Sequence, residues 1–163
     1  MIKYLIMDVD GTLTDGKIYI SPSGEAFKAF DVKDGYAIHA LLKKHSIIPV
    51  IITGRNSEIV SRRAIELDIK EIHQGASDKL EVLHKILNQE NQSFDTVAYI
   101  GDDLNDIECM TLVKNSGGYV GCPADAVAEV KEVASYICSS NGGCGAVREF
   151  ISKIIKLNNR GRQ

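Results

Sequence analysis

Hydrophobic residues along this chain fall into two alternating patterns. Short, nearly continuous apolar runs are typical of strands buried in a sheet, and they predict strands over residues 4–7, 48–52, 69–72, 96–100 and, more weakly, 118–120. Between them, apolar residues recur at the spacing of one face of a helix. This second pattern predicts helices over residues 35–44, 58–67, 79–88, 106–113, 126–131 and about 146–157, with Ser57 and Ser77 as N-caps of the second and third.

The alternation of strands and helices predicts an α/β fold, a Rossmann-like parallel sheet with helices on both faces. One segment departs from this order. Residues 17–20 and 26–32 have the pattern of two strands around the turn-forming residues 21–24, which predicts a β-hairpin insertion (about 17–32) after the first strand. We expect residues 1–163 to form a single domain with a C-terminal helix and polar tail at about 146–163.

Composition and charge exclude some classes of function. The net charge of −3 argues against nucleic-acid binding, which needs a basic stripe. No apolar run approaches the ~18 residues of a membrane span, and the apolar N-terminus is short and runs into two aspartates, as a buried strand does. The four cysteines have neither C-x-x-C nor His spacing, so we expect free thiols in the reducing cytoplasm.

Polar side chains follow the predicted strands, at the edge of an open α/β sheet where ligands bind. In chain order the residues with these side chains are Asp8, Asp10, Thr53, Arg55, Lys79, Asp102, Asp103 and Asp106, and Gly54 lies between Thr53 and Arg55. Several carboxylates this close repel one another, and a bound cation relieves the repulsion. Oxygen-only ligands favour Mg²⁺. A metal, a lysine and a hydroxyl suit phosphoryl transfer, in which one carboxylate attacks phosphorus and another, two residues on, transfers protons.

The combination Asp8-Val-Asp10-Gly-Thr, Thr53, Lys79 and GDD-x-x-D at 101–106 resembles the four motifs of the haloacid dehalogenase superfamily. The resemblance implies that Asp8 is the nucleophile and Asp10 the acid/base. It further implies metal ligation by Asp8, the Asp10 carbonyl and Asp102, with Asp103 and Asp106 behind these ligands and Thr53 and Lys79 on the phosphate. An aspartate at the Asp10 position is typical of phosphatases and phosphotransferases.

The two gaps where this superfamily inserts a cap domain, from Asp10 to Thr53 and from Thr53 to Lys79, are filled by the predicted hairpin, helices and strands. We therefore expect no cap domain. An uncapped site is open to solvent in a monomer, so either the substrate is large or a neighbouring subunit covers the site.

Longer stretches resemble the 3-deoxy-D-manno-octulosonate 8-phosphate (KDO 8-phosphate) phosphatases: TDG at 14–16, FDVKDG at 30–35, ITGR at 52–55, QG at 74–75 and GGCGAVRE at 142–149. The resemblance implies a keto-sugar phosphate substrate bound by Thr53, Gly54, Arg55 and Lys79. It also implies a homotetramer whose active site is completed by a neighbouring subunit. The sugar acid released by this activity would serve lipopolysaccharide synthesis. Arg63 and Arg148 are possible contacts to substrate or neighbour, or ordinary surface charges.

One departure from this family concerns Cys144, which stands where an arginine is usual, so the contacts of this segment with substrate are open. Arg55 favours the eight-carbon substrate over a nine-carbon acylneuraminate or KDN 9-phosphate, which remains an alternative. A non-catalytic tetramerisation module, similar to the C-terminal domain of CMP-acylneuraminate synthetases, is a second alternative. A signalling receiver domain fits poorly, because its phospho-acceptor follows the third strand, where Gln74 and Gly75 stand here.

Overall fold

The computed structural model describes residues 1–161, and residues 162–163 lie outside the described part. Its centre is a six-stranded, wholly parallel sheet in the order β5-β4-β1-β6-β7-β8. The strands are β1 (Tyr4–Met7), β4 (Ile48–Ile52), β5 (Glu71–His73), β6 (Val97–Ile100), β7 (Tyr119–Cys122) and β8 (Tyr136–Ile137). The chain proceeds from β1 first to one side and then to the other, so the order reverses beside β1, where such sheets bind ligands.

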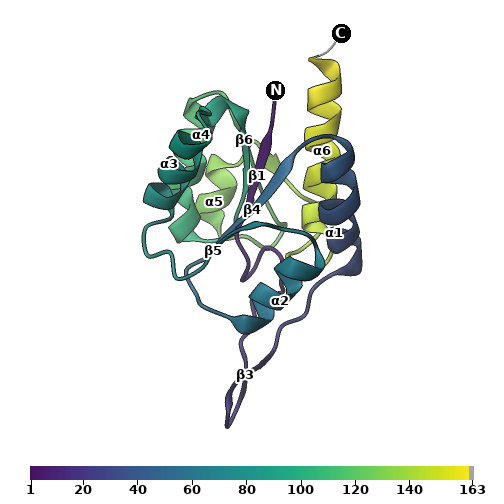
Figure 1. The fold of residues 1–163 in the computed structure, drawn as a ribbon, viewed down its shortest axis with the longest axis vertical. Coiled ribbons are helices and arrows are strands. Elements are labelled where there is room, and N and C mark those ends of the chain that lie inside the picture. The colour runs from purple at the N-terminus through teal and green to yellow at the C-terminus, as the bar shows by residue number, and fades with distance from the viewer. Residues whose placement is uncertain (162–163) are drawn as a thin grey trace.

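Helices cover both faces of the sheet, as the alternation predicts (Figure 1). One face carries α1 (Val32–Tyr36), its π-helical continuation η1 (Ala37–Leu42), α2 (Glu58–Glu66) and α6 (Ala146–Arg160). The other carries α3 (Lys79–Gln89), α4 (Ile107–Asn115) and α5 (Ala128–Val133), with short 3-10 turns η2 (Phe94–Thr96) and η3 (Leu104–Asp106). Strand residues alternate between the faces: Leu5 and Met7 join one core, Tyr4 and Ile6 the other.

Side-chain caps explain where three of the helices begin. Ser57 caps α2, as predicted, by accepting from the N–H of Val60. The prediction of Ser77 for α3 was wrong, because Asp78 is the N-cap and accepts from the N–H of Glu81. Helix α1 begins at Val32, before the predicted start, because Asp31 accepts from two N–H groups of its first turn.

The predicted hairpin is present as β2 (Tyr19–Ser21) and β3 (Gly24–Phe27), paired antiparallel. It projects beyond the sheet at the end where β1 terminates (Figure 1). The expected extension of its second strand to residue 32 was wrong, since β3 ends at Phe27 and residue 32 already belongs to α1. Within residues 1–161, the segment between β1 and β4 contains this hairpin and α1–η1, and no cap domain.

The C-terminal helix is longer than predicted. Helix α6 continues to Arg160, and Asn158 exchanges two hydrogen bonds of 2.8 Å with the backbone of Ile2, so this part of the expected polar tail is fixed against the sheet. The edge strand β8 was not predicted, since two residues give no readable period. No helix among residues 1–161 is long and apolar enough to cross a membrane.

Candidate active site

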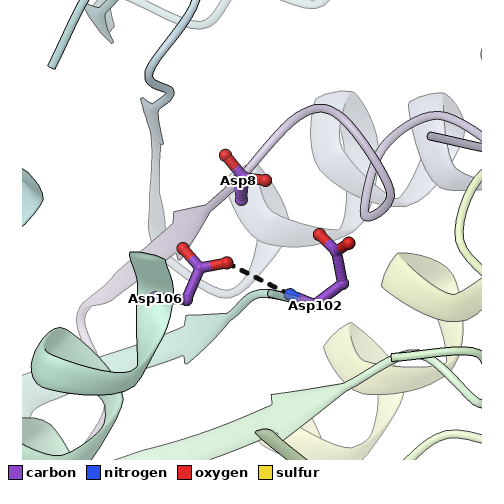
Figure 2. Close-up of side chains that lie close together, drawn as sticks. All are labelled: Asp8, Asp102 and Asp106. Atoms are coloured by element: carbon purple, nitrogen blue, oxygen red, sulfur yellow. Dashed lines mark hydrogen bonds between the residues drawn. The ribbon is translucent and has the colours of Figure 1, made fainter. Parts of the chain in front are cut away.

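The carboxyl ends of β1 and β6 bring Asp8 and Asp102 to the same edge of the sheet. The two strands pair in parallel with Met7 opposite Ile100, and the N–H of Asp8 donates to the Ile100 carbonyl at 3.1 Å. One carboxylate oxygen from each of Asp8, Asp102 and Asp106 lies within 4.8 Å of the others. Figure 2 shows the three side chains facing a common space. Parallel pairing in register therefore assembles carboxylates that are far apart in sequence.

Asp106 organises the centre of this cluster from a fully buried position. Its Oδ1 accepts from Lys79 Nζ and from the hydroxyl of Tyr99, each at 2.7 Å. Its Oδ2 accepts from the backbone N–H groups of Asp102, at 3.2 Å, and Asp103, at 3.4 Å (Figure 2 marks the bond to Asp102). Asp106 thus holds both the lysine and the backbone of the loop that carries Asp102.

Lys79 is the first residue of α3 and reaches the end of β1. Its side chain is buried, and its Nζ donates to Asp8 Oδ1 at 2.7 Å as well as to Asp106. Burial alone would lower the pKa of Lys79, but the carboxylates of Asp8 and Asp106 raise it above its ordinary value. Lys79 therefore stays charged beside the proposed nucleophile.

The excess of negative charge makes this a site that fits a divalent cation. Burial and the neighbouring Asp106 raise the pKa of Asp8 to about 6, although Lys79 opposes the shift. Burial and Asp8 raise the pKa of Asp102 to about 8. A hard cation among these oxygens would relieve the repulsion, and oxygen ligands suit Mg²⁺. Four donors already occupy the oxygens of Asp106, so Asp8 and Asp102 are the two carboxylates of this cluster that fit a cation better.

Asp102 is aimed by the loop that follows β1. Thr12 donates from its hydroxyl to Asp102 Oδ1 at 2.9 Å. Gly11 lies beside Asp102 with a φ of 94°, and a Cβ at this position would overlap the Asp102 carboxylate. Only glycine combines this left-handed backbone with so close an approach.

Asp10, two residues beyond Asp8, is in contact with the hairpin segment. Its carboxylate pairs with Lys28, and its Oδ2 lies 3.8 Å from Arg55 Nε. Lys28 also pairs with Glu25 at 3.0 Å. Neither Lys28 nor Glu25 was predicted as a site residue, and no motif in the sequence singles them out.

A cleft of about 150 Å³ connects these groups, and Arg55 stands half-exposed at its mouth. It is lined by Asp8, Asp10, Thr53, Gly54, Arg55, Asp103 and Asn105. A larger cavity of about 400 Å³ lies near the start of β4, lined in part by Ile47, Pro49 and Leu67, at the end of the sheet opposite the carboxylates. The chemistry of the lining, rather than the volume, identifies the smaller cleft as the candidate site.

Arg63 and Arg148, considered above either as contacts to substrate or neighbour or as surface charges, each contact side chains of this same chain. The guanidinium of Arg63 pairs with Glu66 at 2.7 Å and lies 5.7 Å from the ring centroid of Phe30. The guanidinium of Arg148 lies over the ring of Tyr36, also at 5.7 Å. Neither arginine lines the cleft.

The segment 142–145 packs directly on the loop that follows β1. The N–H of Gly143 donates to the Thr12 carbonyl at 3.1 Å, and a Cβ on Gly142 would overlap the carbonyl oxygen of Gly11. Cys144, in this segment, is exposed. The segment therefore borders the site through its backbone.

The sequence of this chain is similar to those of known phosphate-ester hydrolases. Residues 51–151 match the model of the haloacid dehalogenase-like hydrolases. The chain is 42% identical over 154 residues to the KDO 8-phosphate phosphatase KdsC of Yersinia pestis, an alignment that covers 94% of this chain and 80% of the relative. The Escherichia coli K12 protein of the same name is also 42% identical, with 94% and 79% covered. The chain belongs to the haloacid dehalogenase-like hydrolase family.

The fold of this chain is also similar to those of solved phosphatase structures. The KDO 8-phosphate phosphatase of Moraxella catarrhalis, in complex with magnesium, phosphate and KDO, superposes with a TM-score of 0.88 at 41% identity, covering 95% of this chain and 86% of that one. The cobalt-bound enzyme of Haemophilus influenzae gives a TM-score of 0.87 at 35% identity, covering 95% and 88%. These values confirm the predicted capless α/β fold.

Proposed function

We propose that this protein is a magnesium-dependent phosphatase that hydrolyses KDO 8-phosphate to KDO and phosphate. The observation that carries the proposal is the position of Asp8. Its carboxylate is held by Lys79 at 2.7 Å, faces Asp102, and shares a cleft with Asp10 and Thr53. A nucleophile, an acid/base and a phosphate-binding cation are the groups that hydrolysis through a phosphorylated aspartate requires.

In this mechanism each residue acts from the position it has in the structure. Asp8 attacks phosphorus while Asp10 gives a proton to the departing sugar oxygen, and the aspartyl-phosphate forms. Asp10 then takes a proton from the water that attacks the aspartyl-phosphate, and inorganic phosphate leaves. Lys79 and Thr53 bind the oxygens of the transferring phosphoryl group. Asp8, the Asp10 carbonyl and Asp102 would hold Mg²⁺, which would supply positive charge to the phosphoryl group.

The substrate assignment rests on the relatives and on the mouth of the cleft. The curated relatives described above are named for KDO 8-phosphate, and the Moraxella structure contains KDO and phosphate. In this chain the half-exposed guanidinium of Arg55 is available to a sugar carboxylate. Because the nine-carbon sugar acids carry a carboxylate too, it is the names of these relatives that lead us to prefer the eight-carbon substrate. The complete catalytic set argues against a purely structural module.

We also propose a homotetramer in the cytoplasm, with the open cleft completed by a neighbouring subunit. Apolar side chains on and just after the hairpin are exposed in the monomer, among them Ile20, Phe27, Val32 and Tyr36. Such a patch fits burial against another copy of the chain. All four cysteines are free, which fits a reducing compartment. Sedimentation of the purified protein tests the assembly, since a monomer would contradict it.

The activity test is phosphate release from KDO 8-phosphate, a nine-carbon keto-sugar phosphate, other sugar phosphates and 4-nitrophenyl phosphate, with Mg²⁺ or with chelator. We expect metal-dependent release that is fastest from KDO 8-phosphate. Faster release from the nine-carbon ester would replace the substrate and keep the chemistry. A folded protein that releases phosphate from none of the esters would refute the proposal.

A further inference from the structure

Lys28 occupies an unusual position for a lysine on a projecting hairpin. Only 2% of its side chain is exposed, although the hairpin extends away from the sheet (Figure 1). Its Nζ contacts the Asp10 carboxylate on one side and Glu25 Oε1, at 3.0 Å, on the other. Covering an ammonium group is costly unless it is paired with charges, and here two carboxylates provide the pairing. The hairpin therefore delivers a fixed positive charge to the acid/base residue.

A set of contacts fastens Lys28 in this position. Glu25 accepts a short hydrogen bond from the hydroxyl of Ser57, the N-cap of α2, and lies 3.9 Å from Arg55 Nη2. Through Glu25, the second residue of β3, the hairpin is thus tied both to the start of α2 and to the loop after β4. A lysine held at two carboxylates in this way has few positions available to its long side chain.

Lys28 touches Asp10 without lining the cleft. It engages Asp10 Oδ1, and Asp10 Oδ2 is the oxygen near Arg55, which does line the cleft. The contact therefore anchors one oxygen of the carboxyl group and leaves the other beside Arg55, a residue that lines the cleft. Small misplacements of a catalytic group are expensive, about 100-fold in rate for ~1 Å.

We propose that Lys28 is a positioning residue for Asp10, which makes the hairpin part of the proton-transfer apparatus. The inference rests on the proposed function, because it requires Asp10 to act as acid and then as base. In the first step the P–O bond to the leaving group breaks as Asp8 bonds to phosphorus, and the proton of Asp10 moves to the leaving oxygen. In the second step the oxygen of water bonds to phosphorus, the bond from phosphorus to the Asp8 oxygen breaks, and a proton of that water moves to Asp10.

This role predicts a dependence on the leaving group. An alkoxide leaves from phosphorus with difficulty unless it receives a proton, whereas 4-nitrophenolate leaves without one. The value of kcat/KM reports only the steps up to departure of the first product. We therefore compare kcat/KM for an alkyl ester, such as KDO 8-phosphate, with kcat/KM for 4-nitrophenyl phosphate, at saturating Mg²⁺.

The test variant is Lys28→Met, and the matched control is Lys17→Met. Lys17 lies in the same part of the chain but is largely exposed, and within residues 1–161 its side chain pairs with Asp15 alone, at 3.8 Å. For Lys28→Met we expect kcat/KM to fall about 10- to 100-fold on the alkyl ester and less than about 3-fold on the aryl ester. Lys17→Met stays within about 2-fold of wild type on both.

Two further measurements separate positioning from a purely structural effect. With 4-nitrophenyl phosphate, Lys28→Met should give a burst of nitrophenolate close to one per site, because the second step still needs Asp10 as base. Lys28→Arg keeps the charge and should recover part of the lost kcat/KM on the alkyl ester. If Lys28→Met fails to fold, Glu25→Gln removes the second anchor of Lys28 and should produce the same selectivity for leaving group in weaker form.

Equal losses on both esters, or none on either, would overturn the positioning role while leaving the proposed phosphatase intact. A different preferred sugar would not affect the comparison, because any alkyl phosphate that the enzyme hydrolyses can replace KDO 8-phosphate. A wild-type protein that hydrolyses no ester would overturn both proposals.

Discussion

Tyr99 is the residue through which the core of the sheet contacts the candidate site. It lies in β6, is fully buried, and its hydroxyl donates to Asp106 Oδ1 at 2.7 Å, the same oxygen that receives Lys79. Burial and the carboxylate of Asp106 raise the pKa of Tyr99 well above its ordinary value, so the hydroxyl stays protonated and can donate. Tyr99→Phe removes this one donor and keeps the ring.

The size of the effect follows from the partner. A hydrogen bond to a charged group contributes about 1.5–3 kcal/mol to stability, and its loss here leaves a buried carboxylate short of one donor. In a chain of this length about 2–4 °C in Tm corresponds to 1 kcal/mol, so we expect Tm to fall by about 3–12 °C. A looser Asp106 also releases Lys79, and a cost of ~1.4 kcal/mol in the transition state lowers kcat about 10-fold.

The assay is thermal unfolding, which gives Tm, together with steady-state kinetics on the preferred ester. Tyr119→Phe is the control, because Tyr119 lies in the adjacent strand β7, stacks on Phe150 at 5.8 Å, and has no hydroxyl hydrogen bond within residues 1–161. The control should change stability by less than about 0.5 kcal/mol. If the two variants unfold alike, the Tyr99–Asp106 bond does not stabilise the site. If only stability falls and kcat is unchanged, Asp106 does not act through Lys79.

Four further changes test other parts of the site. Asp8→Asn should lower kcat at least ~10³-fold, because an amide does not attack phosphorus, and rapid turnover by this variant would exclude the covalent route. Wild type should gain about 2.7 kcal/mol of stability at a Mg²⁺ concentration 100 times Kd. Asp102→Asn should need far more Mg²⁺ both for this gain and for activity. If its Mg²⁺ titration matches that of wild type, Asp102 is not a metal ligand. Burial raises the pKa of Asp34 from 3.8 to about 6. Because the folded state then holds this proton more tightly, its contribution to stability is complete below pH 3.8 and is lost as the pH rises through 6. From pH 4 to pH 8, the free energy of unfolding of wild type should fall by on the order of 2 kcal/mol relative to that of Asp34→Asn, after allowance for partial solvent screening. If the stability of the two proteins changes with pH in the same way, the raised pKa of Asp34 is contradicted. Gly142→Ala should cost ~1–3 kcal/mol and impair turnover, because its Cβ overlaps a carbonyl oxygen of the loop after β1, whereas Gly161→Ala, with no contact closer than 3.9 Å, should behave as wild type.

The sequence determined the features that depend on local order. Apolar runs and helical spacing located β1, β4, β5, β6, β7 and the helices, because burial of a strand on both faces gives a short apolar run that is visible in one stretch of chain. Strand ends in a parallel sheet point to one edge, so the assembly of Asp8, Lys79 and Asp102 followed from the same pattern. Boundaries were less secure. Ser77 and Asp78 are both capable caps, and only the backbone conformation at Asp78 decides between them.

Tertiary structure alone decided which side chains support the site. Lys28, just after the hairpin strand β3, contacts Asp10 in the loop after β1. The N–H of Arg148 donates to Asp34 from a position 114 residues further along the chain. Such contacts leave no period in the sequence, because they depend on how separate elements pack and not on the neighbours along the chain. A lysine in a hairpin and a tyrosine in a buried strand have ordinary sequence surroundings. Their contacts with the candidate site arise only because the fold places Asp10 beside Lys28 and Asp106 beside Tyr99.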